Sequence, residues 1–145
     1  MECLKVKRVK WNAALPERKT SGSAGYDITA CLDAPVVLSP GESRMIGSGL
    51  AVAIQPGYAA FIYARSGLGI KHGIVPANCV GVIDSDYRGE VIVGLRNLGD
   101  APYTVNNGDR IAQMVIAKCE APEIVVCDDL DDTLRAGGGF GSTGS

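Results

Sequence analysis

Short apolar runs separated by tight turns recur along most of this sequence and constrain its fold more than any other feature. Turn residues lie between the runs, as Pro-Gly at 40–41 and 56–57 and as Asn-Asn-Gly-Asp at 106–109. Short runs bounded in this way are typical of strands in β-barrels and β-sandwiches. The predicted strands are residues 4–6, 9–11, 35–38, 50–54, 58–64, 74–76, 79–83, 90–98, 103–105, 110–118 and 123–126.

Helical patterning is almost absent from the sequence. No 15-residue window has the apolar spacing of a long helix, and the 19 glycines and 7 prolines favour strands and turns. One short helix is expected to start at Ser66, whose hydroxyl can cap the turn that follows. The sequence therefore predicts an all-β fold, a jelly-roll-like β-barrel or sandwich with one short helix.

The strand pattern stops near residue 127, and the last part of the chain has a different composition. Residues 128–132 are mostly acidic, and the segment after Arg135 is rich in glycine. Such a segment buries little apolar surface and is expected to be flexible. With 145 residues, the chain is predicted to form a single β-barrel domain at 1–127 followed by a C-terminal tail at 128–145.

Charge and hydropathy exclude several classes of partner. The formal net charge is −2, so no broad basic surface is available for nucleic acid. No apolar stretch approaches the roughly 18 residues of a membrane helix. The N-terminus alternates charged and apolar residues and lacks the apolar core of a signal peptide. These features predict a cytoplasmic protein that binds neither nucleic acid nor membrane.

Cysteine and histidine usage limits the metal and redox chemistry. The five cysteines are scattered and never in C-x-x-C spacing, so they are interpreted as free, mostly buried thiols of a reducing compartment. His72 is the only histidine, which excludes a site built from several histidines.

Residues 81–90 carry the strongest candidate for chemistry. An apolar run delivers Asp84 to a turn that also holds Tyr87 and Arg88, and apolar residues resume at Val91. This pattern predicts a β-hairpin with a carboxylate at its tip. A carboxylate fixed at a strand end can orient or deprotonate a water molecule. On these residues alone, an ordinary polar hairpin tip fits equally well.

Three further features point to a polyphosphate ligand. Arg65, Ser66 and Gly67 lie where a strand gives way to the short helix and could bind an anion, although a simple helix cap is the commoner meaning. The tail joins Arg135 to a glycine-rich segment that could wrap phosphates. Phe140 in that segment could stack on a base, and a plain flexible terminus is the alternative.

The third feature is residues 108–113, which set polar groups such as Gln113 into a strand, and Asp27 is a further candidate with a weaker signal. Gln113 shares a strand face with apolar residues, and a buried glutamine needs hydrogen-bond partners. That partner could be a ligand or the protein itself. Asp27 follows Gly25-Tyr26 and is interpreted as a carboxylate in a turn.

Taken together and in order, these motifs closely resemble those of the trimeric dUTP diphosphatases. The similarity extends from about Ser21 to Gly144, and five motifs in order are far more specific than any one of them. The motifs are Ala24-Gly25-Tyr26-Asp27, Arg65-Ser66-Gly67-Leu68, Gly81 to Glu90, Gly108-Asp109-Arg110-Ile111-Ala112-Gln113, and Arg135 to Gly144.

The resemblance assigns a role to each candidate residue. It implies that Asp84 activates the water that attacks the α-phosphorus of dUTP, and that Tyr87 packs against the deoxyribose. Residues implied to hold the uracil are Asn78, Val82, Ile83, Asp84 and Ile92. Residues implied to hold the phosphates are Arg65, Ser66, Gly67 and Gln113. Tail residues implied to close over the nucleotide are Arg135, Phe140, Gly141, Ser142 and Thr143.

The resemblance also implies an assembly, a metal and a biological role. The products would be dUMP and pyrophosphate, which limits uracil incorporation into DNA and supplies dUMP for thymidylate synthesis. Mg²⁺ would ride on the triphosphate, with Asp27 contacting it through water. The partners would be dUTP and two further copies of the chain, in a homotrimer whose sites are shared between subunits.

One position departs from the family pattern, and two other functions compete. Ala136 stands where glycine often follows the arginine, and a positive φ there would cost on the order of 1 kcal/mol.

The related dCTP deaminases share the fold but need their own acid–base group beside the base. A non-catalytic nucleotide-binding trimer is the other alternative, although it would have little reason to keep Asp84 and Gln113.

Overall fold

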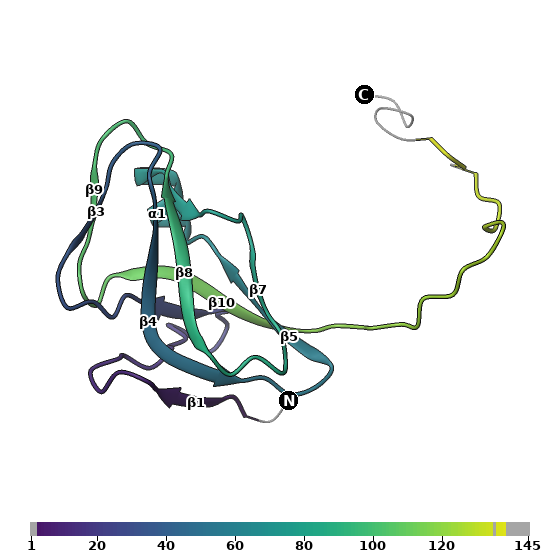
Figure 1. Cartoon of the computed structure of the whole chain (residues 1–145), viewed down its shortest axis with the longest axis horizontal. Helices are drawn as coiled ribbons and strands as arrows, with labels where there is room; N and C mark the ends of the chain where they lie inside the picture. Colours follow the sequence, from purple (N-terminus) through teal and green to yellow (C-terminus); the bar gives the residue numbers. More distant parts are fainter. Residues whose placement is uncertain (1–2, 135, 139–145) are drawn as a thin grey trace.

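The computed structural model describes residues 3–134 and 136–138, and strands dominate this part of the chain (Figure 1). It contains ten strands and one helix within those ranges. In chain order they are β1 (Lys5–Arg8), β2 (Tyr26–Thr29), β3 (Val36–Leu38), β4 (Ser43–Ala53), β5 (Tyr58–Tyr63), α1 (Ser66–His72), β6 (Ile74–Pro76), β7 (Gly81–Ile83), β8 (Glu90–Asn97), β9 (Tyr103–Val105) and β10 (Arg110–Lys118).

Two four-stranded antiparallel sheets enclose the core. One sheet has the order β1-β4-β8-β6 and the other β2-β10-β5-β7, while β3 and β9 form a small two-stranded sheet (Figure 1). Ile46 and Val93 of the first sheet belong to the same buried cluster as Ile62 and Met114 of the second. The side chains between the sheets are thus shared, as in two sheets packed face to face. This architecture confirms the predicted all-β jelly-roll fold.

Strand β8 illustrates why the sequence folds in this way. Val91, Val93 and Leu95 are buried, whereas Ile92 between them is 47% exposed. Alternation with a period of two is what a strand needs when only one of its faces meets the core. The exposed face of β8 is therefore free to line a site.

Strand β4 bends where its pairing with β8 changes register. The register shifts between Gly47 and Ala51, as at a β-bulge. Gly49 in this bend has φ +68°, and a Cβ there would lie 2.8 Å from the Cβ of Ala13. Both the backbone conformation and the close approach require glycine at this position.

Strand β2 differs from the expectation drawn from the sequence, in which residues 23–27 form a turn. In the structure Asp27 lies inside β2, paired with Gln113 of β10. Tyr26–Thr29 is only four residues long and follows Gly25, so it offers too short a pattern for detection. Asp27 is therefore held by sheet pairing rather than by turn geometry.

The hairpin predicted around Asp84 is wrong. Strand β7 pairs with β5, whereas β8 pairs with β4 and β6, so the two strands belong to different sheets. Residues 84–89 cross from one sheet to the other. The apolar runs on either side were identified correctly, but sequence alone does not say that each run finds its partner elsewhere.

Helix α1 confirms the predicted short helix but not its cap. Ser66 is the first helical residue, and Arg65 occupies the N-cap position without a side-chain capping hydrogen bond. The helix ends at Gly73, which has φ +66° and donates its N–H to the carbonyl of Gly69. Within the described ranges, no helix is long and apolar enough to cross a membrane.

The chain leaves both sheets after β10 and runs outward as an extended segment (Figure 1). The strand predicted at 123–126 is absent, and Ile124, Val125 and Val126 are at least 76% exposed. An apolar segment becomes a strand only when it pairs with a neighbouring edge, and the described residues 119–134 form no strand with any part of the described chain. The boundary predicted at 127 stays a prediction.

The cysteines are free, as predicted, but they are not mostly buried. Only Cys31 is buried, Cys119 is partly exposed, and Cys3, Cys79 and Cys127 are exposed. Cys79 lies in the loop before β7 rather than in the strand expected from residue 79. Loop and terminal positions explain the exposure of these thiols.

Candidate active site

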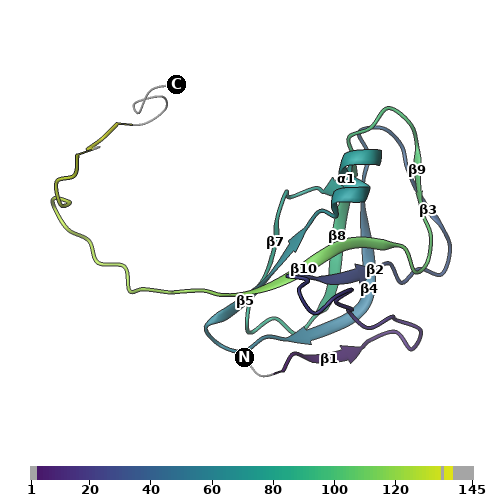
Figure 2. The same ribbon diagram turned by 180° about the vertical axis from the view of Figure 1, so that it is seen from behind.

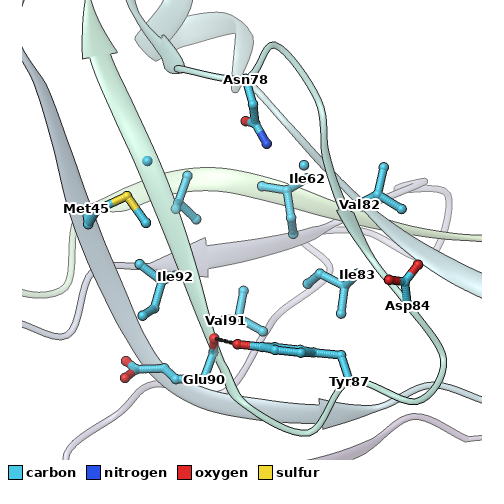
Figure 3. A pocket seen from close by; sticks show the side chains of 13 residues that line it. Met45, Ile62, Asn78, Val82, Ile83, Asp84, Tyr87, Glu90, Val91 and Ile92 are labelled. Atoms are coloured by element: carbon cyan, nitrogen blue, oxygen red, sulfur yellow. Dashed lines mark hydrogen bonds between the residues drawn. The ribbon is translucent and has the colours of Figure 1, made fainter.

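A cavity of about 330 Å³ opens between β7 and β8 at the point where the two sheets separate (Figure 3). We call it the strand pocket and define it by Ile62, Asn78, Ile83, Asp84, Tyr87 and Ile92. Its floor is apolar, with Ile62 and Ile83 almost completely buried. A flat, mostly uncharged ring could enter such a space, while the polar groups at its rim would orient it.

Asp84 lies at the mouth of the strand pocket, directly after the last residue of β7. The carbonyl of Asp84 accepts a hydrogen bond of 3.2 Å from the N–H of Tyr87, which fixes the turn. Within the described ranges, its exposed carboxylate makes no hydrogen bond or ion pair. Both oxygens are thus available to a water molecule.

Asn78 and Tyr87 lie at opposite ends of the strand pocket (Figure 3). The amide of Asn78, in the loop between β6 and β7, can both donate and accept hydrogen bonds. The Tyr87 hydroxyl donates to the carbonyl of Glu90 at 3.0 Å, which holds the ring across the end of the pocket. Val82 and Ile92 complete the two sides, one from each strand.

Glu90 and Met45 line the strand pocket but were not among the residues expected to do so. The carboxylate of Glu90 accepts a hydrogen bond of 2.7 Å from the N–H of Gly49, so it ties β8 to the bend of β4. Met45 reaches the pocket because β4 pairs with β8, and it faces Gly94 there. Only strand pairing brings Met45 close, so no local sequence signal could have identified it.

A second hollow, of about 290 Å³, is strongly polar. We call it the arginine hollow and define it by Asp27, Arg65, Ser66, Arg110 and Gln113. Strand β10 lies between β2 and β5, and it supplies Arg110 and Gln113 beside Asp27 of β2 (Figure 2). Arg65, the N-cap residue of α1, lies two residues after the end of β5, and Ser66 begins the helix.

Ion pairs organise the arginine hollow. Arg65 Nε donates to Asp27 Oδ1 at 2.9 Å, and Arg110 Nη1 donates to Asp27 Oδ2 at 3.0 Å. Arg65 Nη1 also contacts the carbonyl of Arg110 at 3.4 Å. Two cations share one carboxylate, so the cluster keeps a positive charge.

Gln113 has the hydrogen-bond partner that its position demanded. Its Nε2 donates to the carbonyl of Ala64 at 3.0 Å. A Cβ at Gly25 would lie 3.2 Å from Gln113 Oε1, so this glycine leaves room for the amide. The amide is half-buried and oriented, with its oxygen toward β2.

Most of the expected site residues therefore fall into two groups within one chain, and Gly67 lines a neighbouring hollow with Arg65 and Arg110. Asn78, Asp84 and Tyr87 meet in the strand pocket, whereas Asp27 and Arg65 meet in the arginine hollow, and the two cavities share no lining residue. Arg110 was not expected individually, although it lies in a motif that was recognised. Arg135, Phe140, Gly141, Ser142 and Thr143 lie outside the described residues.

The described residues do not form a protein-held metal centre. No group of three or more Asp, Glu, His or Cys side chains in these ranges could bind a metal ion. Both oxygens of Asp27 already accept hydrogen bonds from guanidinium groups. A water-mediated contact between Asp27 and a metal stays a prediction.

A free carboxylate beside a ring-sized pocket, together with a hollow lined by arginines, is an arrangement suited to an enzyme that acts on nucleotides. Comparison with known proteins supports this class of enzyme. The model of the family described as dUTPase matches residues 11–144. The chain belongs to the dUTPase family.

Curated relatives support this assignment over nearly the whole chain. The deoxyuridine 5'-triphosphate nucleotidohydrolase of Hahella chejuensis is 51% identical over 140 residues, covering 96% of this chain and 92% of the relative. The enzyme of the same name from Paraburkholderia xenovorans is 46% identical, covering 97% and 96%.

Solved structures agree on the fold. A mutant dUTPase of Staphylococcus bacteriophage 80alpha, with bound dUpNHpp, has a TM-score of 0.92 at 29% identity and covers both chains completely. A mutant dUTPase of phage phi11 of S. aureus, described with a structural Mg(II) ion, has a TM-score of 0.82 at 29% identity and covers 90% of this chain and 99% of that one.

Proposed function

We propose that this chain hydrolyses dUTP to dUMP and pyrophosphate. A water molecule attacks the α-phosphorus and the bond to the bridging oxygen of the β-phosphate breaks. Asp84 accepts the proton that the water loses, and pyrophosphate departs with the bridging oxygen. The free carboxylate at the mouth of the strand pocket carries this proposal, because a general base must reach the water before it can activate it.

The strand pocket selects the base and the sugar. The Asn78 amide matches the alternating donor and acceptor groups of the uracil edge. Main-chain groups of Val82, Ile83 and Asp84 contact the base from one side of the pocket, and Ile92 contacts it from the other. Cytosine would leave these groups unpaired, which can reach roughly 10⁴-fold discrimination. Tyr87, held by its bond to Glu90, occupies the space that a ribose 2′-hydroxyl would need.

The arginine hollow holds the phosphates. Arg65, Ser66 and Gln113 supply a positive charge, a hydroxyl and a side-chain amide there. Gly67, which lines a neighbouring hollow together with Arg65 and Arg110, adds a backbone amide. Displacement at phosphorus depends mainly on positioning and charge neutralisation, so the protein needs no covalent intermediate. Asp84 then has only a water proton to remove.

The substrate is the magnesium complex of dUTP. Since the described residues supply no ligand set of their own, the ion arrives with the triphosphate. Mg²⁺ on the phosphate oxygens would offset part of their negative charge. The chain itself contributes the guanidinium groups that meet the remaining charge.

A complete site requires more than one copy of the chain. The two cavities share no lining residue, which supports a homotrimer in which one subunit offers its strand pocket and another its arginine hollow. The tail from 128 to 145 closes over the nucleotide, with Phe140 on the base and Arg135, Gly141, Ser142 and Thr143 near the phosphates. Hydrolysis then limits uracil incorporation into DNA and supplies dUMP for thymidylate synthesis.

The test is pyrophosphate release with Mg²⁺ from dUTP, dTTP, dCTP and UTP in parallel. Release from dUTP alone is the expected result, because Asn78 and Tyr87 set the base and sugar. Ammonia from dCTP would instead identify a deaminase. Binding of dUTP without any product would identify a non-catalytic binding protein.

A further inference from the structure

Asp27 joins two arginines that come from different parts of the chain. It lies in β2, while Arg65 follows β5 and Arg110 begins β10. Asp27 is only 14% exposed, and each of its oxygens accepts one guanidinium hydrogen bond, at 2.9 and 3.0 Å. Because β10 pairs with both β2 and β5, the sheet itself sets the positions of all three side chains.

The outward parts of both guanidinium groups remain available. Within the described ranges, Arg65 Nη2 and Arg110 Nη2 make no hydrogen bond. Arg110 is 44% exposed and Arg65 is 24% exposed. A guanidinium carries five N–H donors in a planar fork that matches phosphate oxygens. Each arginine thus donates hydrogen bonds to Asp27 from its inner N–H groups, while its outer N–H groups can bind an anion.

We propose that Asp27 is a positioning residue that holds Arg65 and Arg110 as one preformed cradle for the triphosphate, and that Arg110 binds phosphate directly. This inference rests on the proposed function only for the identity of the anion. Two neighbouring guanidinium groups repel each other, and Asp27 offsets that repulsion while fixing both forks. Fixing long side chains before binding removes an entropy cost that binding would otherwise carry.

The same contacts argue against Asp27 as a direct metal ligand. Both of its oxygens face cationic groups, which repel a divalent ion. A role in metal binding and a role in arginine positioning make different predictions when Mg²⁺ is removed. Only the positioning role operates without the metal.

The experiment measures the affinity of the full chain for inorganic tripolyphosphate by calorimetry, in EDTA, for the wild type and for Asp27→Asn. Positioning predicts at least tenfold weaker binding in the variant, although the variant is more positive by one charge. A charge effect alone predicts the opposite, tighter binding. Glu17→Gln is the matched control, because Glu17 lies at the rim of the same hollow and pairs with Lys19 rather than an arginine.

Arg110→Gln provides a second variant if Asp27→Asn does not fold. It is expected to weaken tripolyphosphate binding at least tenfold, and the double variant is expected to be little worse than Arg110→Gln alone, because the two residues act together. Affinity for dUMP, which lacks the β- and γ-phosphates, should change less than twofold in every variant.

Three results would overturn the proposal. In the first, Asp27→Asn binds tripolyphosphate as tightly as the wild type in EDTA and is weaker only when Mg²⁺ is present. In the second, Arg110→Gln binds tripolyphosphate as tightly as the wild type. In the third, the wild type does not bind tripolyphosphate. Failure of the proposed function would give a different result. If the wild type releases no pyrophosphate from dUTP, but Asp27→Asn still weakens tripolyphosphate binding, the cradle is retained and only the proposed reaction is removed.

Discussion

The strand pocket lies between strands of the two sheets, whereas the arginine hollow lies on the sheet that contains β2 and β10, and the two differ in how their charged side chains are held. The strand pocket is apolar at its floor, and within the described ranges its proposed catalytic carboxylate, Asp84, is left without a partner. In the arginine hollow the charged side chains are tied to one another through Asp27. A reactive group must stay free to meet water, whereas groups that only bind gain from being fixed in advance.

The largest effect is expected from Asp84→Asn, which should separate chemistry from binding. Turnover of dUTP should fall by about 10²- to 10⁴-fold, because the water loses its general base while the shape of the pocket is retained. Rapid-quench measurement of pyrophosphate gives the rate, and calorimetry with dUpNHpp gives the affinity. Unchanged turnover would remove Asp84 from the role of base.

Truncation after Leu134 tests how fast the two cavities hydrolyse dUTP without the tail. We expect kcat to fall by about 10²-fold, the scale at which loss of substrate positioning acts. Light scattering should report the same oligomer as the full chain, because the sheets end at Lys118. Full activity of the truncated chain would contradict tail closure.

Tyr87→Ala should affect the strand pocket alone. Selectivity for dUTP over UTP should fall by about tenfold, since removing the ring opens space for a 2′-hydroxyl. A change of this size lies within the roughly 1–3 kcal/mol that one pocket contact contributes to selectivity. The ratio of kcat/KM for the two nucleotides measures it. Tyr87→Phe is the control, because it keeps the ring and loses only the 3.0 Å hydrogen bond to Glu90. Equal selectivity in Tyr87→Ala and the wild type would show that another residue reads the sugar.

Gly47→Ala should act on stability more than on chemistry. A Cβ at this position would lie 2.6 Å from Glu90 Oε1 and would displace the carboxylate from the N–H of Gly49. We expect a loss of about 1–3 kcal/mol in the free energy of unfolding, as for overpacking combined with a lost hydrogen bond. Urea denaturation measures it, with Gly22→Ala as the control because nothing lies within 4 Å there. Equal losses in both variants would mean that the contact with Glu90 is not responsible.

Much of the fold could be predicted from the sequence because the turns and alternating strands are local signals. Strand β8, with its buried Val91 and exposed Ile92, is an example. The partners of each strand are not local. For that reason the sequence predicts a hairpin of β7 and β8, although the two strands pair in different sheets.

The candidate site divides in the same way. Asp84 and Arg65 were found because their motifs are contiguous, whereas Met45 enters the strand pocket only through the pairing of β4 with β8. The role of Arg110 depends on its approach to Asp27, which is 83 positions away in the sequence. Ala136 has φ +42°, so the strain that its identity suggested is present in the backbone.

The most direct test of the account is whether the two cavities of different copies form one site. Asp84→Asn and Arg65→Ala, each inactive alone, should be co-expressed with different tags, and the mixed oligomer should be purified through both. In a cyclic trimer that contains both variants, about one third of the sites regain both wild-type residues, so dUTP turnover should return to about that fraction. Mixed oligomers with no more activity than either variant alone would show that one copy supplies both residues, and would contradict the account.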